Sequence, residues 1–191
     1  ARAGVSVKIL LDAVGSATIG NRILTELEKG PCEVAWFNPP RWYSIDWLNH
    51  RTHRKSLIVD GRVGFTGGAG IADIWTGDAQ DEFHWRDIQV RIEGPGVVPL
   101  QTGFSENWQV TTGEFINGTA FFPDPAPVGG VSVQTIMSVP SSGASDARTL
   151  YYLSIVCAKR TIEIANPYFV PDEVGKLVHA EARADLLACV R

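Results

Sequence analysis

Hydrophobic residues at the start of the chain follow the pattern of a strand, a helix and a second strand. Residues 5–11 (VSVKILL) are a nearly continuous apolar, β-branched run, which predicts a largely buried strand. In residues 18–29 the apolar side chains recur at helical spacing until Gly30 ends the run. Residues 33–37 predict a second short strand. This β-α-β order favours an α/β layered domain.

A β-hairpin is predicted next. Two β-rich runs, residues 56–59 and 63–66, are joined through Asp60 and Gly61. This dipeptide readily adopts the positive φ angles that a tight hairpin turn needs. Residues 87–92 predict a further strand after a glycine-rich bend.

The later part of the chain alternates helices and strands around a linker. Residues 98–108 predict a helix, because apolar side chains recur there at i, i+4 and i+8. Proline and glycine cluster at residues 123–130, as is typical of a linker. The elements expected beyond it are a strand at 131–139, a helix at 147–158, a strand at 161–165 and a helix at 173–182.

Composition mainly excludes classes of protein. The 191 residues include 17 Lys and Arg against 21 Asp and Glu, a net charge of −4, and 45% are hydrophobic. These values exclude general disorder and a uniformly basic nucleic-acid-binding surface. The three cysteines, irregularly spaced, form neither a disulfide framework nor a zinc pattern, and they fit core thiols of a reducing compartment. No uncharged apolar run approaches the roughly 18–20 residues that span a bilayer.

The densest chemical signal is the segment NHRTHRK, residues 49–55. It places two histidines and three cations within seven positions of an otherwise acidic chain, as binding of a phosphate or phosphodiester requires. On a strand, His53 and Lys55 point to the same face, because they are two residues apart. That face would present an imidazole able to attack or transfer a proton, and an ammonium suited to phosphate oxygens. Gly67 and Gly68 would let backbone N–H groups approach the same anion.

Two other interpretations of this segment start from the same residues. The residues equally fit a solvated hairpin edge, where Lys and Arg oppose aggregation. A zinc site at His50 and His53 is disfavoured, since a strand places residues i and i+3 on opposite faces and no cysteine joins them.

A longer pattern, H-x-K-x4-D-x6-G-G, covers five residues: His53, Lys55, Asp60, Gly67 and Gly68. This pattern resembles the HKD motif of the phospholipase D superfamily. The blocks around it, VDGRVGFTGG and HWRDIQVRIEGPGV, are similar to the cardiolipin synthase branch. The segments VSVKILLDAVGS and NPYFVPDE also resemble parts of the family, so the resemblance covers nearly the whole chain. It implies an α/β fold, namely a phospholipase D-like α/β/α sandwich with a mixed central sheet.

The resemblance also implies an activity. Such proteins hydrolyse or transfer phosphodiesters of phospholipids through a covalent phosphohistidine, with no metal and no other cofactor. By position, His53 would be the nucleophile and Lys55 would hold a non-bridging phosphate oxygen. Asp87 would be the third catalytic residue, accepting a hydrogen bond from the imidazole and so fixing its tautomer; otherwise it is a solvated residue at the start of a strand. Asp60 would brace the hairpin turn rather than contact the substrate.

Two features depart from the family pattern. Gly70 stands where the family usually has an asparagine that donates to the bound phosphate. Losing one such donor costs about 2–4 kcal/mol of transition-state stabilisation if it acts as an oxyanion-hole donor does. The sequence also contains no second H-x-K, although the family uses a second histidine to protonate the leaving alkoxide.

These features lead to an expected domain organisation. Residues 1–122 would be a first phospholipase D-like repeat that lacks its first strand and helix, residues 123–130 a linker, and residues 131–191 the start of a second repeat whose HKD motif is absent. We also expect the later strand and helix, around residues 161–182, to fill the vacant place in the sheet of the first unit.

The leading functional interpretation is a fragment of a phospholipase D or cardiolipin synthase-type enzyme. Its substrate would be a phospholipid such as phosphatidylglycerol, and the protein would be cytoplasmic with peripheral contact to the membrane. One alternative is a single-motif phosphodiesterase or nuclease that completes its site in a homodimer, although the charge of −4 disfavours nucleic acid. Another is a phosphate-binding fragment without turnover.

Overall fold

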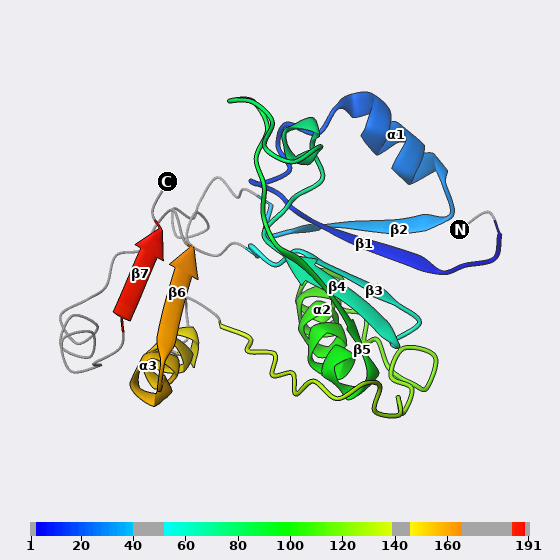
Figure 1. The fold of residues 1–191 in the computed structure, drawn as a ribbon. Helices are drawn as coiled ribbons and strands as arrows, with labels where there is room; N and C mark the ends of the chain where they lie inside the picture. The colour runs from blue at the N-terminus through cyan, green and yellow to red at the C-terminus, as the bar shows by residue number, and fades with distance from the viewer. Residues whose placement is uncertain (1–2, 40–51, 139–145, 166–184, 190–191) are drawn as a thin grey trace. The chain divides into compact units, whose positions relative to one another are not determined.

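The fold contains both helices and strands (Figure 1). The computed structural model describes residues 3–39, 52–138, 146–165 and 185–189. The chain divides into two compact units, Ala1–Thr135 and Ile136–Arg191, and each contains helix and strand. The mixed α/β class predicted from the sequence is therefore confirmed.

The first unit begins with the predicted β-α-β arrangement, made of β1 (Val7–Asp12), α1 (Asn21–Lys29) and β2 (Cys32–Phe37). β1 and β2 pair in parallel, with Val7 opposite Cys32. A parallel pair needs a crossover connection, and α1 provides it. α1 begins later than the apolar periodicity predicts, because Gly20 at its N-cap has an extended backbone.

The predicted hairpin is also confirmed. β3 (Ser56–Val59) pairs antiparallel with β4 (Val63–Gly67). Asp60 and Gly61 occupy the turn with φ angles of 52° and 61°. The N–H of Arg62 closes it by donating to the carbonyl of Val59 at 3.0 Å. β5 (Gln89–Glu93) pairs antiparallel with β4, which gives the strand order β3-β4-β5.

Helix α2 (Val97–Thr112) packs on one face of this three-stranded sheet, as Figure 1 shows. Gly64 of β4 permits the close approach, because a Cβ there would contact side chains of Val97 and Leu100. Trp108 is 2% exposed, and its ring stacks on Phe104 with 5.8 Å between centroids. The predicted apolar face of this helix therefore forms the core. Two short 3₁₀ helices flank β5 in the sequence, η2 (Asp73–Trp75) and η3 (Gly94–Gly96).

The second unit contains α3 (Asp146–Cys157), β6 (Thr161–Ala165) and β7 (Asp185–Cys189). α3 and β6 confirm the predicted helix and strand. β7 pairs in parallel with β6 and was not predicted, because a short apolar run does not distinguish a strand from a helix. The helix predicted at residues 173–182 lies outside the described residues.

The strand expected at 131–139 is wrong. Residues 131–138 form no strand, and Val131 is 85% exposed. A β-branched run becomes a strand only where a neighbouring strand pairs with it, whereas the side chain of Val133 lies against Gly96.

Candidate functional site

The segment that carries His53 is fixed in place at Thr52. The backbone N–H of Thr52 donates to Oδ2 of Asp12, at the end of β1, across 2.9 Å. The side-chain amide of Asn107 on α2 donates to the hydroxyl of Thr52 at 3.1 Å. The residue before His53 is thus tied to a strand and to a helix that lie far from it in sequence.

Arg54 and Lys55 anchor the same segment on its other side. The guanidinium of Arg54 donates to the carbonyl of Gly103 on α2 at 3.1 Å. The hydroxyl of Thr66 on β4 donates to the carbonyl of Lys55 at 2.9 Å. These bonds hold the segment against α2 and β4 by Arg54 and by backbone, so the side chains of His53 and Lys55 remain available for a ligand.

His53 and Lys55 contact each other. Nζ of Lys55 lies 3.3 Å from Nε2 and 3.5 Å from Nδ1 of His53. The segment lies immediately before β3 rather than within it, yet the spacing of two residues still brings the side chains together, as the sequence predicts. His53 is exposed and Lys55 is half-buried. An anion arriving from solvent can therefore meet an imidazole and an ammonium at once.

Gly67, Gly68 and Asp87 form a second cluster, at the end of β4. A Cβ on Gly68 would overlap the carboxylate of Asp87, and one on Gly67 would overlap the carbonyl of Ile88. Glycine is thus required here for close approach of Asp87 to the backbone. The N–H of Gly68 donates to the carbonyl of Ile88 at 3.3 Å. Its proposed use in phosphate binding therefore requires this bond to open.

The structure does not join the two clusters by the expected hydrogen bond. His53 and Asp87 both lie in the described part of the chain, and no hydrogen bond links them. Oδ1 of Asp87 instead accepts from the N–H of Ile88 at 2.6 Å. Asp60 lies in the hairpin turn, where its positive φ suits the bracing role predicted for it. Gly70, at the position of the family's asparagine, lies against the indole nitrogen of Trp75.

A buried ion-pair network centred on Lys8 was missed by sequence reasoning. The side chain of Lys8 on β1 is only 8% exposed, and its Nζ lies 2.8 Å from a carboxylate oxygen of both Glu33 and Glu114. Nζ also lies 4.8 Å from the ring centre of Trp108, whose Nε1 donates to Glu114 at 2.8 Å. The available signal was a single cation within the apolar run VKILL.

This network shifts two pKa values. Burial opposes the charge of Lys8, but hydrogen bonds and charges from Glu114 and Glu33 together outweigh it and raise the pKa of Lys8 above 10.5. The hydrogen bond from Lys8, followed by that from Trp108, lowers the pKa of Glu114 below 4.5. Both groups are therefore charged at neutral pH.

Two further properties of the described residues bear on function. Their His, Cys, Asp and Glu side chains form no group of three placed to hold a metal ion. Every helix among them is too short or too polar to cross a bilayer.

The sequence was compared with families and with individual known proteins. No protein-family model matches the chain. It is 39% identical over 176 residues to the cardiolipin synthase of Geobacillus kaustophilus and 36% identical over 177 residues to the major cardiolipin synthase ClsA of Bacillus subtilis. It is 34% identical over 183 residues to cardiolipin synthase 1 of Bacillus cereus. These matches cover 90–91% of this chain but only 35–36% of each relative, so the chain spans about a third of their length. This similarity supports a cardiolipin synthase-like identity for the chain.

Proposed function

We propose that this chain carries the nucleophilic half of a phosphatidyltransferase site that acts on phospholipids such as phosphatidylglycerol. The observation that carries the proposal is the contact between His53 and Lys55, an exposed imidazole 3.3 Å from an ammonium on an anchored segment. The similarity to proteins named cardiolipin synthases supports the same reaction class.

In the first step, a ring nitrogen of His53 attacks the phosphorus of phosphatidylglycerol. A nitrogen–phosphorus bond forms, the bond from phosphorus to the headgroup glycerol breaks, and glycerol leaves after taking up a proton. In the second step, a headgroup hydroxyl of another phosphatidylglycerol attacks the phosphohistidine and gives up its proton. The nitrogen–phosphorus bond breaks, which yields cardiolipin and restores the imidazole. Attack by water instead gives hydrolysis.

Lys55 stabilises the phosphate during both steps. Its ammonium is close enough to His53 to reach a non-bridging oxygen of a phosphate bound there, and it would offset the negative charge that develops on that oxygen. Asp87 would orient the imidazole after its carboxylate turns away from the N–H of Ile88. The glycine pair next to it, Gly67 and Gly68, would give backbone access to the phosphate.

The missing proton donor defines what must complete the site. The single H-x-K of the sequence supplies the nucleophile, and the leaving glycerol still needs a general acid. A second HKD half, or a second copy of the chain in a homodimer, would provide it. The complete fold would be the α/β/α sandwich with a mixed central sheet, in peripheral contact with the membrane that holds its substrate.

The test is chemical capture of the phosphohistidine. The chain is mixed with vesicles of phosphatidyl-p-nitrophenol, whose leaving group departs without a general acid, then quenched in base, digested and analysed by mass spectrometry for a phosphatidyl adduct on His53. We expect the adduct in wild type and in the control His84→Ala, and none in His53→Ala. Equal background in all three proteins, with no released p-nitrophenolate, would overturn the proposal.

That negative result would favour a second candidate function, phosphate binding without turnover. The specific observation in its favour is the combination of one H-x-K with Gly70 at the asparagine position. Titration with inorganic phosphate would then shift the imidazole NMR signals of His53, and Lys55→Met would weaken that binding.

A further inference from the structure

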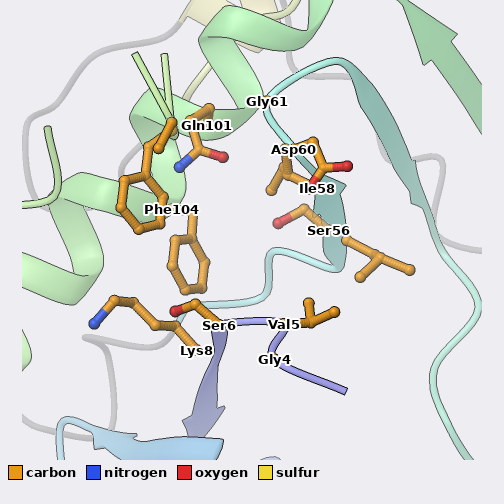
Figure 2. Close-up of a pocket in the computed structure, with 13 residues that line it drawn as sticks. Gly4, Val5, Ser6, Lys8, Ser56, Ile58, Asp60, Gly61, Gln101 and Phe104 are labelled. Carbon is orange, nitrogen blue, oxygen red and sulfur yellow. The ribbon is translucent and has the colours of Figure 1, made fainter. Parts of the chain in front are cut away.

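A cavity of about 440 Å³ lies in the first unit. It opens between the start of β1, the strand β3 with its turn, and α2, and Figure 2 shows the side chains that face it. Neither His53 nor Lys55 lines it. Its volume falls within the range of about 300–1,000 Å³ that is usual for small-molecule sites.

One polar side chain in this cavity is buried without a hydrogen bond. Gln101 of α2 is only 6% exposed, and Figure 2 shows its amide directed from the helix into the cavity. No residue of the described chain donates to its oxygen or accepts from its nitrogen. Because the amide carries two N–H donors and an acceptor oxygen, the side chain is suited to a ligand that both donates and accepts.

The rest of the lining narrows the class of ligand. The hydroxyls of Ser6 and Ser56 add two groups that can donate or accept, and the carboxylate of Asp60 can accept. The rings of Phe104 and Phe121 form apolar walls. Aromatic walls with a few placed polar groups suit a ligand with C–H surfaces and hydroxyls on the same small body.

Charge and hydrogen-bonding capacity disfavour anionic ligands and amines. The ammonium of Lys8 at the cavity is already paired with Glu33 and Glu114, and Asp60 adds a further negative charge, so an anion is repelled. An amine would only donate and would leave the nitrogen of Gln101 unsatisfied. A neutral hydroxyl compound satisfies both ends of the amide.

We propose that this cavity is a binding site for a small neutral polyol, a compound with neighbouring hydroxyls on a short carbon chain. Glycerol has this chemistry, either free or as the headgroup of phosphatidylglycerol. The site is separate from the proposed catalytic pair, and its test measures binding rather than turnover. A negative result in the phosphohistidine experiment would therefore not affect this inference, and absence of polyol binding would not affect the proposed function.

The test is an NMR titration of the whole chain, labelled with ¹⁵N, that follows the backbone N–H signals of the lining residues Ser6, Ser56 and Phe104 and, where present, the side-chain amide signal of Gln101. One arm adds glycerol, a second adds soluble short-chain phosphatidylglycerol, and a third adds the matching phosphatidylcholine, which has no headgroup glycerol. We expect a saturable shift with glycerol. A shift with phosphatidylglycerol but not with phosphatidylcholine would show that a lipid headgroup can supply the ligand. No shift with either lipid would show that the site takes free glycerol only.

The variants are Gln101→Leu and, as matched control on the same helix, Gln109→Leu, whose side chain is exposed. Glycerol should bind about tenfold more weakly to Gln101→Leu, corresponding to about 1.4 kcal/mol, and unchanged to the control. If Gln101→Leu does not fold, Ser56→Ala should show weakening by about threefold. Absence of a saturable shift with glycerol, or equal affinity in wild type and variant, would overturn the proposal.

Discussion

The backbone N–H of Thr52 lies 2.9 Å from Oδ2 of Asp12, and this bond joins the residue before His53 to the end of β1. Oδ1 of the same carboxylate accepts from the N–H groups of Val14 and Gly15 at 3.1 and 2.7 Å. One side chain therefore holds both the loop after β1 and the start of the HKD segment. The position of the proposed nucleophile depends on it.

We predict that Asp12→Ala destabilises the chain by about 1–3 kcal/mol, because three backbone N–H groups lose their acceptor. The stability of Asp12→Asn should lie between that of wild type and that of Asp12→Ala, since its amide oxygen can still accept from Val14 and Gly15. Urea denaturation gives the free energies of unfolding. The exposed Asp124 provides the control, and Asp124→Ala should change stability by less than about 0.5 kcal/mol. Equal effects of the two alanine substitutions would contradict the anchoring role.

The close packing around Gly67 and Gly68 leads to a prediction about stability. Gly68→Ala should cost about 1–3 kcal/mol, because its Cβ would overlap the carboxylate of Asp87. Shortening Asp87 to Ser in the same protein should recover part of the loss, since the two positions are coupled through this contact. Gly130→Ala is the control, because no atom lies within 4 Å of a Cβ there. The measurement is again urea denaturation, and a double variant no more stable than Gly68→Ala would count against the contact.

Local order along the first unit could be predicted from the sequence. The alternation of apolar runs located β1, α1 and β2, and Asp60-Gly61 located the hairpin turn, because in each case neighbouring residues decide the structure. The failures were long-range. Whether residues 131–138 become a strand depends on a partner strand elsewhere in the chain, which no local pattern contains.

In the candidate site, too, contacts between neighbouring residues could be predicted from the sequence, whereas long-range contacts could not. The contact of His53 with Lys55 follows from a spacing of two residues. The anchor at Asp12 is 40 residues from Thr52, and the pair of Lys8 with Glu114 spans 106 residues. Such partners become visible only once the strands and helix are placed. The cavity at Gln101 was missed for this reason, since a polar residue on a helix gives no sign of being buried.

Lys55 gives a prediction about rate. Under the proposed function, Lys55→Met should lower kcat by about 10²- to 10³-fold, because it removes the cation proposed to offset the developing phosphate charge. Lys55→Arg should retain more activity than Lys55→Met, although its planar guanidinium does not replace a point charge fully. Release of glycerol from phosphatidylglycerol measures the rate. Lys159→Met, at an exposed lysine, is the control and should match wild type. A similar loss at both positions would show that overall charge, rather than Lys55, matters.

The network of Lys8, Glu114 and Trp108 predicts how stability depends on pH. Hydrogen bonds from Lys8 and then Trp108 lower the pKa of Glu114 in the folded chain below 4.5, so its contribution is complete above that value and is lost as the pH falls through the lowered pKa. The pKa of Lys8 is raised above 10.5, so its contribution is complete below that value and is lost as the pH rises through the raised pKa. Between these limits the pair should contribute a constant amount.

We therefore expect the free energy of unfolding to fall below pH 4.5 less steeply in Glu114→Gln than in wild type, because the glutamine cannot be protonated. At neutral pH the same variant should be less stable, since Lys8 loses one of its two carboxylate partners while its side chain stays only 8% exposed. Urea denaturation across this pH range measures both effects. Glu106→Gln on α2, at an exposed glutamate, should follow the wild-type curve. The stability of Glu114→Gln and that of Glu106→Gln could instead fall equally steeply below pH 4.5. In that case Glu114 does not couple folding to protonation, and the buried ammonium of Lys8 must be held by Glu33 alone.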